Sequence, residues 1–362
     1  MPTMTETTGT GMAPPPRRPS IKDVAKRAGV SWKTVSNVLH DRPHVRAENR
    51  AAVQAAIAEL GYRTSLAGRQ LRQGRTSIAA LALPDITSPY FAALAQELIH
   101  NARGRGLTVL IDETGGDPER ELAAAGGYDM HFADGVIMSP ISVHSFQINE
   151  VQPRSPLVLL GEREDLAEQS LPYDHVAIDN PASAVELTRH LLDQGCRRFG
   201  FIGAEERFGT GYVRHQGVRS ALAEAGLELV ASAPAEAWTR PAGEEAASEL
   251  LASVGHQQDR AGRTDPGIDA LICGNDLLAI GAMRTLRQQG IRIGAEVAVA
   301  GWDDIPEAAY AEPGLTTVGA DLAALVDAAL DRLEARIAGA DEPAVVRLVP
   351  HRLHLRVSTQ RA

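Results

Sequence analysis

Apolar residues recur every three or four positions near the start of the chain, and this spacing predicts short helices. The first apolar stripe consists of Ile21, Val24, Ala25 and Ala28. Ser20 is placed to cap this helix and Gly29 to end it, because glycine adopts positive φ at little steric cost. A second helix is expected after Ser31, and a third over residues 47–60. The second has an apolar side of Val35, Val38 and Leu39 and a polar side of Trp32, Lys33, Ser36 and Asn37.

Two short helices joined by a glycine-containing turn are typical of a helix-turn-helix, although many small bundles share this arrangement. Charge favours the DNA-binding interpretation. Residues 1–76 hold 13 Lys and Arg against 5 Asp and Glu, including all three lysines, Lys22, Lys26 and Lys33. The totals of 36 and 46 leave 23 and 41 for residues 77–362, so a segment of net charge +8 precedes a body of net charge −18. A basic segment of this kind attracts polyanions such as DNA.

From residue 77 onward, short apolar runs alternate with helical stretches. The first runs are 78–84, 107–112, 135–140 and 156–161, and a second series begins at 176–179 and continues with 199–203, 270–274 and 297–302. Near-continuous apolar strands separated by helices predict parallel sheets covered on both faces. The two series predict an α/β core of two similar lobes, with a ligand-binding cleft beyond the carboxyl ends of the strands.

Polar and aromatic side chains follow several of the predicted strands and are the candidates for ligand contacts. They are Asp85, Thr87, Tyr90, Phe91, Arg214, Asn275, Asp276, Trp302, Asp303 and Asp304. Carboxylates, an amide and a guanidinium beside aromatic rings suit a polyhydroxylated ligand, whose hydroxyls they hydrogen-bond and whose apolar face the rings cover. The alternative is that Asn275 and the aspartates cap helices, and that Phe91 belongs to the core.

Composition narrows the class of protein further. Cys196 and Cys273 have no metal-binding or disulfide spacing and are expected to be buried thiols of a reducing cytoplasm. Residues 1–19 are rich in Thr, Pro and Gly, which predicts a disordered tail and not a signal peptide. No apolar run approaches the roughly 18 residues that a membrane helix needs. We therefore expect a soluble cytoplasmic protein with no cofactor, metal site or membrane contact.

Five sequence blocks then indicate a family. In order, they are IKDVAKRAGVSWKTVSNVL, AIAELGYR, LRQGRTSIAALALPDITSPYFA, GNDLLAIGAMRTLRQQG and VAGWDDIPEAAYAEPGLTTV. On these residues, from about Ser20 to Thr359, the chain resembles the LacI/GalR family of bacterial transcriptional regulators. The resemblance implies an α/β fold with an N-terminal three-helix, helix-turn-helix DNA-binding head, a hinge helix, and a two-lobed core of parallel sheets like that of periplasmic sugar-binding proteins.

The resemblance also implies domain boundaries. They are a tail at 1–19, the DNA-binding domain at 20–63, the hinge at 64–76, and an effector-binding and dimerisation core at 77–359. Within the core, the N-lobe is expected at about 77–176 and 322–338, and the C-lobe at about 177–320 and 341–359. A homodimer is expected, because the final segment VSTQRA carries no heptad repeat.

In the head, the resemblance assigns base contacts in the major groove to Trp32, Lys33 and Asn37, and phosphate contacts to Ser31, Thr34 and Ser36. Relatives usually have Arg where Asn37 stands, so Asn37 favours adenine or a water-mediated contact. Trp32 has an alternative place beneath the first helix. Arg46 replaces the usual Ser cap, and is expected to contact phosphate without capping the third helix.

In the hinge, Leu71 matches the residue that relatives insert into the minor groove of a palindromic operator, and Arg69 and Arg72 flank it. Gly68 replaces the usual Ala and should weaken an isolated helix by ~1 kcal/mol. Folding of the hinge on DNA makes it a natural switch: an effector that moves the paired N-lobes apart prevents the hinge helices from pairing.

In the core, the resemblance assigns Arg214, Asn275 and Asp303 to sugar hydroxyls or purine edges, and Phe91 and Trp302 to ring stacking. The Asp that often follows the fourth strand is replaced by Gly161-Glu162. We expect a repressor controlled by a sugar or sugar derivative. The alternatives are a purine or nucleoside corepressor, or a sugar-binding protein without a DNA role. An enzyme is not expected, because the chain has no GxGxxG, Walker, HExxH or GxSxG sequence.

Overall fold

The computed structural model describes residues 19–39, 42–62, 75–128, 132–161, 173–203, 209–255, 257–258 and 264–361. The chain divides into two compact units, Met1–Thr76 and Ser77–Ala362. In the described part, no helix combines the length and apolar character needed to cross a bilayer.

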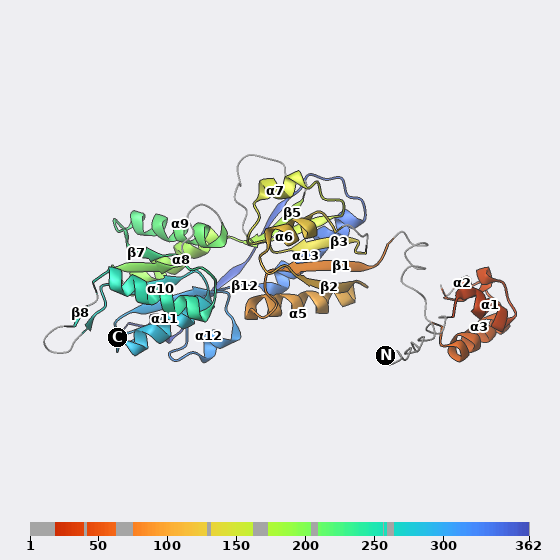
Figure 1. The fold of residues 1–362 in the computed structure, drawn as a ribbon, viewed down its shortest axis with the longest axis horizontal. Coiled ribbons are helices and arrows are strands. Elements are labelled where there is room, and N and C mark those ends of the chain that lie inside the picture. Colours follow the sequence, from red (N-terminus) through yellow and green to blue (C-terminus); the bar gives the residue numbers. More distant parts are fainter. Residues whose placement is uncertain are drawn as a thin grey trace, which may run out of the picture. The chain divides into compact units, whose positions relative to one another are not determined.

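The described part of the first unit contains three helices, α1 (Ile21–Ala28), α2 (Trp32–Leu39) and α3 (Ala47–Leu60) (Figure 1). Ser20 caps α1 as predicted: its backbone N–H donates to the Asp23 carboxylate at 2.7 Å, and its hydroxyl accepts from the Asp23 N–H at 3.4 Å. Gly29 ends α1 with φ +68°. Each helix contributes a fully buried valine to a shared core, namely Val24, Val35 and Val53.

The described part of the second unit contains two six-stranded sheets and a two-stranded pair of β8 (Gln257–Gln258) with β9 (Thr264–Asp265). The first has the order β13-β5-β4-β3-β1-β2 and is entirely parallel; its strands are β1 (Ile78–Leu83), β2 (Thr108–Glu113), β3 (Gly135–Met138), β4 (Leu157–Leu160), β5 (Asp174–Ile178) and β13 (Val346–Val349). Helices α5 (Pro89–Gly104) and α13 (Leu322–Ile337) pack together on one face of the sheet. Helices α6 (Pro118–Ala125) and α7 (Ser145–Glu150) contribute to the core of the other.

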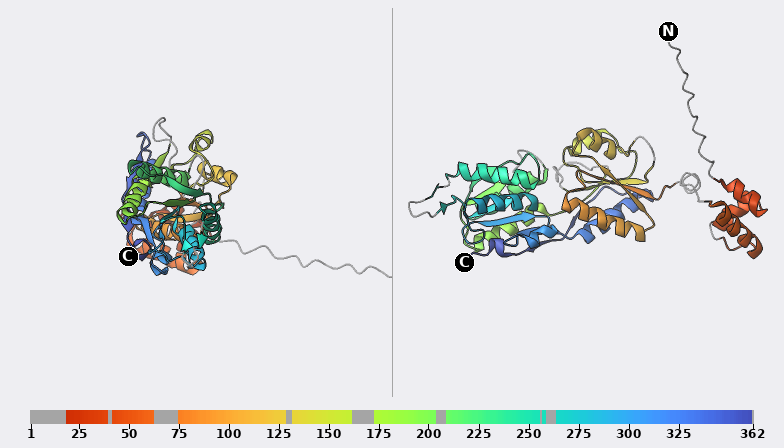
Figure 2. Two further views of the ribbon diagram at one scale, coloured as in Figure 1. Left: turned by 90° about the vertical axis from the view of Figure 1, so that its left-hand side faces the viewer. Right: turned by 60° about the horizontal axis from the view of Figure 1, so that its bottom comes forward.

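The second sheet repeats this plan. Its order is β14-β12-β11-β10-β6-β7, parallel except for β14, and its strands are β6 (Phe199–Ile202), β7 (Leu229–Ala233), β10 (Ala270–Cys273), β11 (Ala298–Trp302), β12 (Thr316–Ala320) and β14 (His351–His354). Helices α8 (Asn180–Asp193) and α9 (Gly209–Glu224) pack on one face, and α10 (Arg240–Ser253) and α11 (Asp276–Gln288) on the other (Figure 2). The remaining described elements are α12 (Pro306–Tyr310) and the 3₁₀ helix η1 (Val357–Thr359).

The two-lobe architecture with parallel sheets is therefore confirmed, but β7, β12 and β14 were not predicted as strands, and two further segments belong to a different sheet from the one expected. The 176–179 run, expected to open the second series, forms β5 of the first sheet, paired with β4 and β13. Residues 346–349, expected in the C-lobe, form β13 of the same sheet. The reason is connectivity: the chain passes between the lobes three times, after β5, after β12 and after β13.

A buried ion pair fixes β13 and α13 to the first sheet. Asp174 is fully buried at the start of β5, and its carboxylate accepts from Arg336 Nε at 2.8 Å, from Arg336 Nη2 at 3.1 Å and from the Val345 N–H at 2.9 Å. Arg332 Nη2 lies 3.2 Å from the same carboxylate. Burial opposes ionisation, but these hydrogen bonds outweigh it and keep the pKa of Asp174 below its usual range.

Candidate functional site

The predicted DNA-reading side chains lie along α2. Trp32 is 59% exposed, so its indole does not pack beneath α1, which was the alternative. Lys33 is also exposed, and Ser31 caps the helix by accepting from the Thr34 N–H at 3.1 Å. Arg46 precedes α3 and its side chain makes no capping hydrogen bond. The base and phosphate contacts of these residues, and of Ser36 and Asn37, remain predictions, and Arg69, Leu71 and Arg72 lie outside the described residues.

In the second lobe, Arg214 is the centre of the candidate effector site. It lies on α9 and is only 6% exposed. Its Nε donates to Asn180 Oδ1 at 2.8 Å, and its Nη1 donates to the Gly274 carbonyl at 2.5 Å. Because the protein itself holds two of its nitrogens, the guanidinium has a defined orientation at the carboxyl end of β10.

Trp302 does not have the expected role. Its ring is fully buried, and the Arg214 guanidinium carbon lies 5.0 Å from the ring centroid. The indole N–H donates to Ser183 Oγ at 3.1 Å. A ring covered in this way cannot present its face to a ligand, so the ring-stacking assignment of Trp302 is corrected: the indole supports Arg214 by a cation–π contact.

Trp238 is the aromatic residue that the sequence did not reveal. Its ring centroid lies 5.9 Å from the Arg214 guanidinium carbon, and a Cβ added to Gly274 would lie 3.3 Å from the ring. The indole is partly exposed, on the loop after β7. Ser232 interrupts the apolar residues of β7 (LVASA), so this edge strand, like β12, β13 and β14, was not among the predicted apolar runs. The available signal was an isolated Trp in the Ala- and Pro-rich segment SAPAEAWTRP.

Asp303 follows β11 and turns its carboxylate toward Arg214, with 3.9 Å between Oδ1 and Arg214 Nη1. Its φ of +106° is rare for a residue with a side chain, and strain of this kind is typical of functional positions. Burial raises the pKa of Asp303 to about 7, and Arg214 opposes the shift. Burial also raises the pKa of the neighbouring Asp276, and the Asp303 carboxylate adds to that shift.

Asn275 caps a helix, which was the alternative to ligand binding, whereas Asp303 does not. Asn275 Oδ1 accepts from the Leu278 N–H at 2.9 Å, so Asn275 caps α11. Ile305, and not Asp303 or Asp304, is the N-cap residue of α12. Asp304 accepts from Arg356 Nη2 at 2.6 Å and is therefore held in the second lobe.

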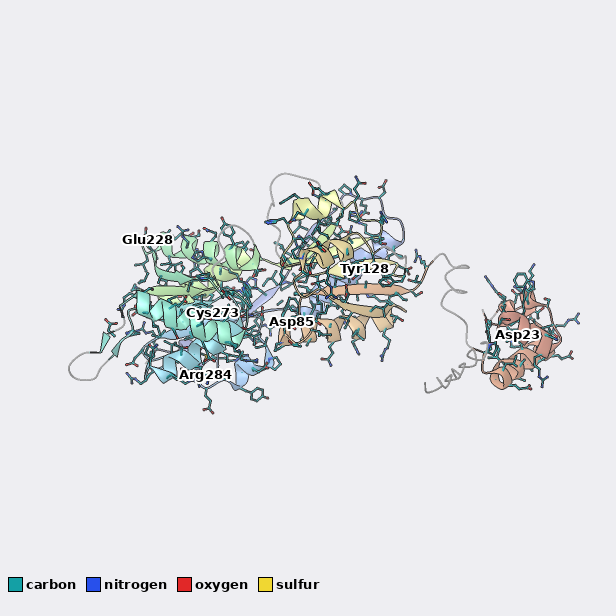
Figure 3. The ribbon with its side chains drawn as sticks, viewed as in Figure 1. Asp23, Asp85, Tyr128, Glu228, Cys273 and Arg284 are labelled. Carbon is teal, nitrogen blue, oxygen red and sulfur yellow. The ribbon has the colours of Figure 1, made fainter. Side chains whose placement is uncertain are left out.

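The first lobe contributes residues that follow β1. Asp85 lies on the side of this lobe that faces the second lobe (Figure 3), and its carboxylate accepts from the N–H and the hydroxyl of Thr87 at 2.7 and 2.6 Å. Tyr90, at the start of α5, packs against the core clusters of both lobes. Burial, followed by the charge of Asp303, raises the pKa of the Tyr90 phenol. Phe91 packs edge-on against Tyr90, with 5.2 Å between ring centroids. The structure thus brings Tyr90, Arg214 and Asp303 together.

A helix-turn-helix unit joined to a two-lobed receptor core, with polar and aromatic groups at the carboxyl ends of its strands, defines a DNA-binding regulator. Comparison with known proteins indicates the same class of protein. The family "Bacterial regulatory proteins, lacI family" matches residues 20–65, and "Periplasmic binding protein-like domain" matches residues 188–359. The repressor PurR of Erwinia tasmaniensis is 30% identical over 321 residues, which cover 88% of this chain and 90% of that protein. The chain belongs to the LacI family of bacterial transcriptional regulators.

Two solved structures show the same architecture. The lac repressor dimer bound to operator and an anti-inducer has a TM-score of 0.82 at 22% identity, covering 95% of this chain and all of that one. The complex of the regulator CelR with cellobiose has a TM-score of 0.66 at 28% identity, covering 94% of this chain and all of that one. The first of these likenesses concerns the fold alone.

Proposed function

We propose that this regulator is a homodimeric repressor that binds a palindromic operator and releases it when a neutral sugar or sugar derivative binds beside Arg214 and Asp303. The observation that carries the proposal is the facing pair of a guanidinium and a carboxylate, with the partly exposed Trp238 next to them. Such a pair donates to and accepts from vicinal hydroxyls, and a ring covers the apolar face of a sugar. The CelR complex with cellobiose supports this ligand class.

A purine corepressor is the second candidate. Its support is the 30% identity with PurR and the Tyr90–Phe91 ring pair at the start of α5. An aromatic pair can stack on a flat base, whereas the Arg214–Asp303 pair can hydrogen-bond its edge. In either case the chain has no catalytic role, and it acts in the cytoplasm, where bacterial DNA is located.

The test is a thermal-shift screen of the purified chain against D-galactose, D-ribose, cellobiose, hypoxanthine and guanine. Operator binding by fluorescence anisotropy then follows, using palindromic duplexes from the regulator's own promoter region. We expect a sugar to raise the melting temperature and to weaken operator binding. A response to the purines alone would replace the sugar with a purine, and a protein that binds none of the palindromic duplexes, with or without ligand, would overturn the proposal.

A further inference from the structure

Asn180 stands where the chain passes from the first lobe to the second. It is the first residue of α8, directly after the N-cap Asp179, whose carboxylate accepts from the Ala182 N–H at 2.9 Å. The preceding strand β5 belongs to the sheet of the first lobe, whereas α8 packs on the sheet of the second. Asn180 is only 3% exposed. Any rotation of the lobes has to be accommodated in this crossover and the two others.

The Asn180 side chain is hydrogen-bonded to Arg214, the centre of the candidate effector site. Its Oδ1 accepts from Arg214 Nε at 2.8 Å, and both side chains are buried at this contact. A hydrogen bond to a charged donor in a buried setting is among the strong ones in proteins. The Asn180–Arg214 hydrogen bond therefore connects the candidate effector site with the crossover between β5 and α8.

A second connection runs through the backbone of the same residue. Ser183 Oγ donates to the Asn180 carbonyl at 2.9 Å and accepts from the Trp302 indole N–H at 3.1 Å. The Trp302 ring lies beneath the Arg214 guanidinium, and Asp303 follows Trp302 in the chain. Asn180, Ser183, Trp302 and Arg214 thus form a closed circuit of contacts that joins the first turn of α8 to the guanidinium.

We propose that Asn180 is a positioning residue that couples Arg214 to the crossover between the lobes, so that effector contact at Arg214 biases how the lobes rotate. The inference rests on the proposed function, because it requires the effector to bind Arg214. A ligand changes a conformational equilibrium only through contacts that differ between the two states. The Asn180–Arg214 hydrogen bond is a contact of this kind. A ligand that moves the guanidinium changes the length of this bond, and the change differs between the two lobe arrangements.

Five variants test the coupling, and they include Arg214→Ala and its combination with Asn180→Ala. Asn180→Ala removes the acceptor, and Asn180→Asp keeps an acceptor oxygen in the same place. Thr188→Val is the matched control, because Thr188 is fully buried on the same helix and donates to the Ala184 carbonyl. Each variant is made in the full chain.

The first measurement needs no ligand. Hydrogen exchange at the amides of residues 182–184 is compared among the wild type, Asn180→Ala, Arg214→Ala and the double variant. We expect each single variant to accelerate exchange by about ten-fold, as the loss of a strong hydrogen bond implies. The double variant should exchange no faster than either single one, and Asn180→Asp and Thr188→Val should stay near the wild type. Additive effects, or no effect, would overturn the coupling.

The second measurement compares operator dissociation constants with and without cellobiose, D-galactose and hypoxanthine. For each probe that changes operator binding of the wild type, Asn180→Ala should reduce that change by about ten-fold, while Asn180→Asp and Thr188→Val retain it. A wild-type response in Asn180→Ala would refute the proposal. If no probe affects the wild type, the proposed ligand class fails, and the hydrogen-exchange result alone decides whether Asn180 is coupled to Arg214.

Discussion

Arg214 Nη1 and Asp303 Oδ1 lie 3.9 Å apart, close enough for electrostatic attraction and too far for a direct hydrogen bond. Asn180, the Gly274 carbonyl and the Trp302 ring hold the arginine, while the backbone of Asp303 has φ +106°. A hydroxyl placed between the two side chains would therefore accept from the guanidinium and donate to the carboxylate.

Loss of either partner should abolish the effector response and leave DNA binding intact. Arg214→Ala removes the guanidinium, and Asp303→Asn is a nearly isosteric change that removes the charge. Operator binding by fluorescence anisotropy should stay within about three-fold of the wild type, whereas ligand binding by calorimetry should fall by about a hundred-fold or more. Arg219→Ala, at an exposed position on the same helix, is the control. An unchanged ligand response in both variants would exclude this site.

Effector affinity should depend on pH around neutrality, because burial raises the pKa of Asp303 to about 7. Sugar hydroxyls donate to an ionised carboxylate, so affinity should increase as the pH rises from about 6 to about 8, with a proton released on binding. Calorimetry in buffers of different ionisation enthalpy measures that proton. Asp303→Asn should bind weakly and without pH dependence; a proton taken up by the wild type would contradict the assignment.

The same titration has a consequence for stability with a defined sign. Between the usual pKa of an Asp, about 4, and the raised value, the folded state keeps a proton that the unfolded state has lost. The free energy of unfolding of the wild type relative to Asp303→Asn should therefore fall as the pH rises through this window, and level off above it. Urea unfolding at several pH values gives this difference, and a difference that increases with pH would be inconsistent with a raised pKa.

The buried Asp174 should be a major contributor to the stability of the first lobe. Asp174→Asn leaves Arg336 and Arg332 without their buried carboxylate, and should cost roughly 3–5 kcal/mol. Asp327→Asn is the matched control, because its side chain is 55% exposed and its ion pair with Arg105 should contribute at most about 1 kcal/mol. Chemical denaturation measures the free energy of unfolding of both variants. Equal losses of stability would show that burial does not determine the contribution of an ion pair.

Asn37 should determine base preference. If Asn37 contacts a base edge, Asn37→Arg should change the preferred base at one position of each half-site toward guanine, by about ten-fold, since Arg pairs with the O6 and N7 of guanine. Selection from duplexes randomised at each position reads out the change. Thr34→Ala, at a predicted phosphate contact, should weaken binding without a change in preference. An unaltered preference in Asn37→Arg would place Asn37 away from the bases.

Leu71 should contribute to specific binding more than to non-specific binding. If it enters the minor groove, Leu71→Ala should weaken operator binding by at least about ten-fold and leave affinity for random DNA nearly unchanged, since non-specific binding is mainly electrostatic. Arg72→Ala should instead weaken both. Anisotropy with operator and scrambled duplexes separates the two effects. Equal losses on both duplexes in Leu71→Ala would argue against insertion.

The capping motifs and the buried strands could be read from the sequence because they depend on neighbouring residues alone. Ser20 and Asp23 cap α1 within one turn, and the apolar runs of β1 and β10 identify strands buried on both faces. The edge strand β7 lacked such a run, and the loop that carries Trp238 was missed with it. The sheet to which β5 and β13 belong depends on pairings with residues far along the chain, which no local pattern contains.

By itself, the sequence determined a cationic helix-turn-helix and two lobes of parallel sheet, and it named Arg214 and Asp303 as candidates for the effector site, because helix periodicity, strand hydrophobicity and family motifs are properties of the linear chain. Only the tertiary structure decided that Trp302 is a buried support and Trp238 is the partly exposed ring, because the burial of an aromatic side chain depends on which elements pack over it. It also decided that Asn180 lies against Arg214, since 34 residues of chain separate them and only the packing of α8 on α9 brings them together.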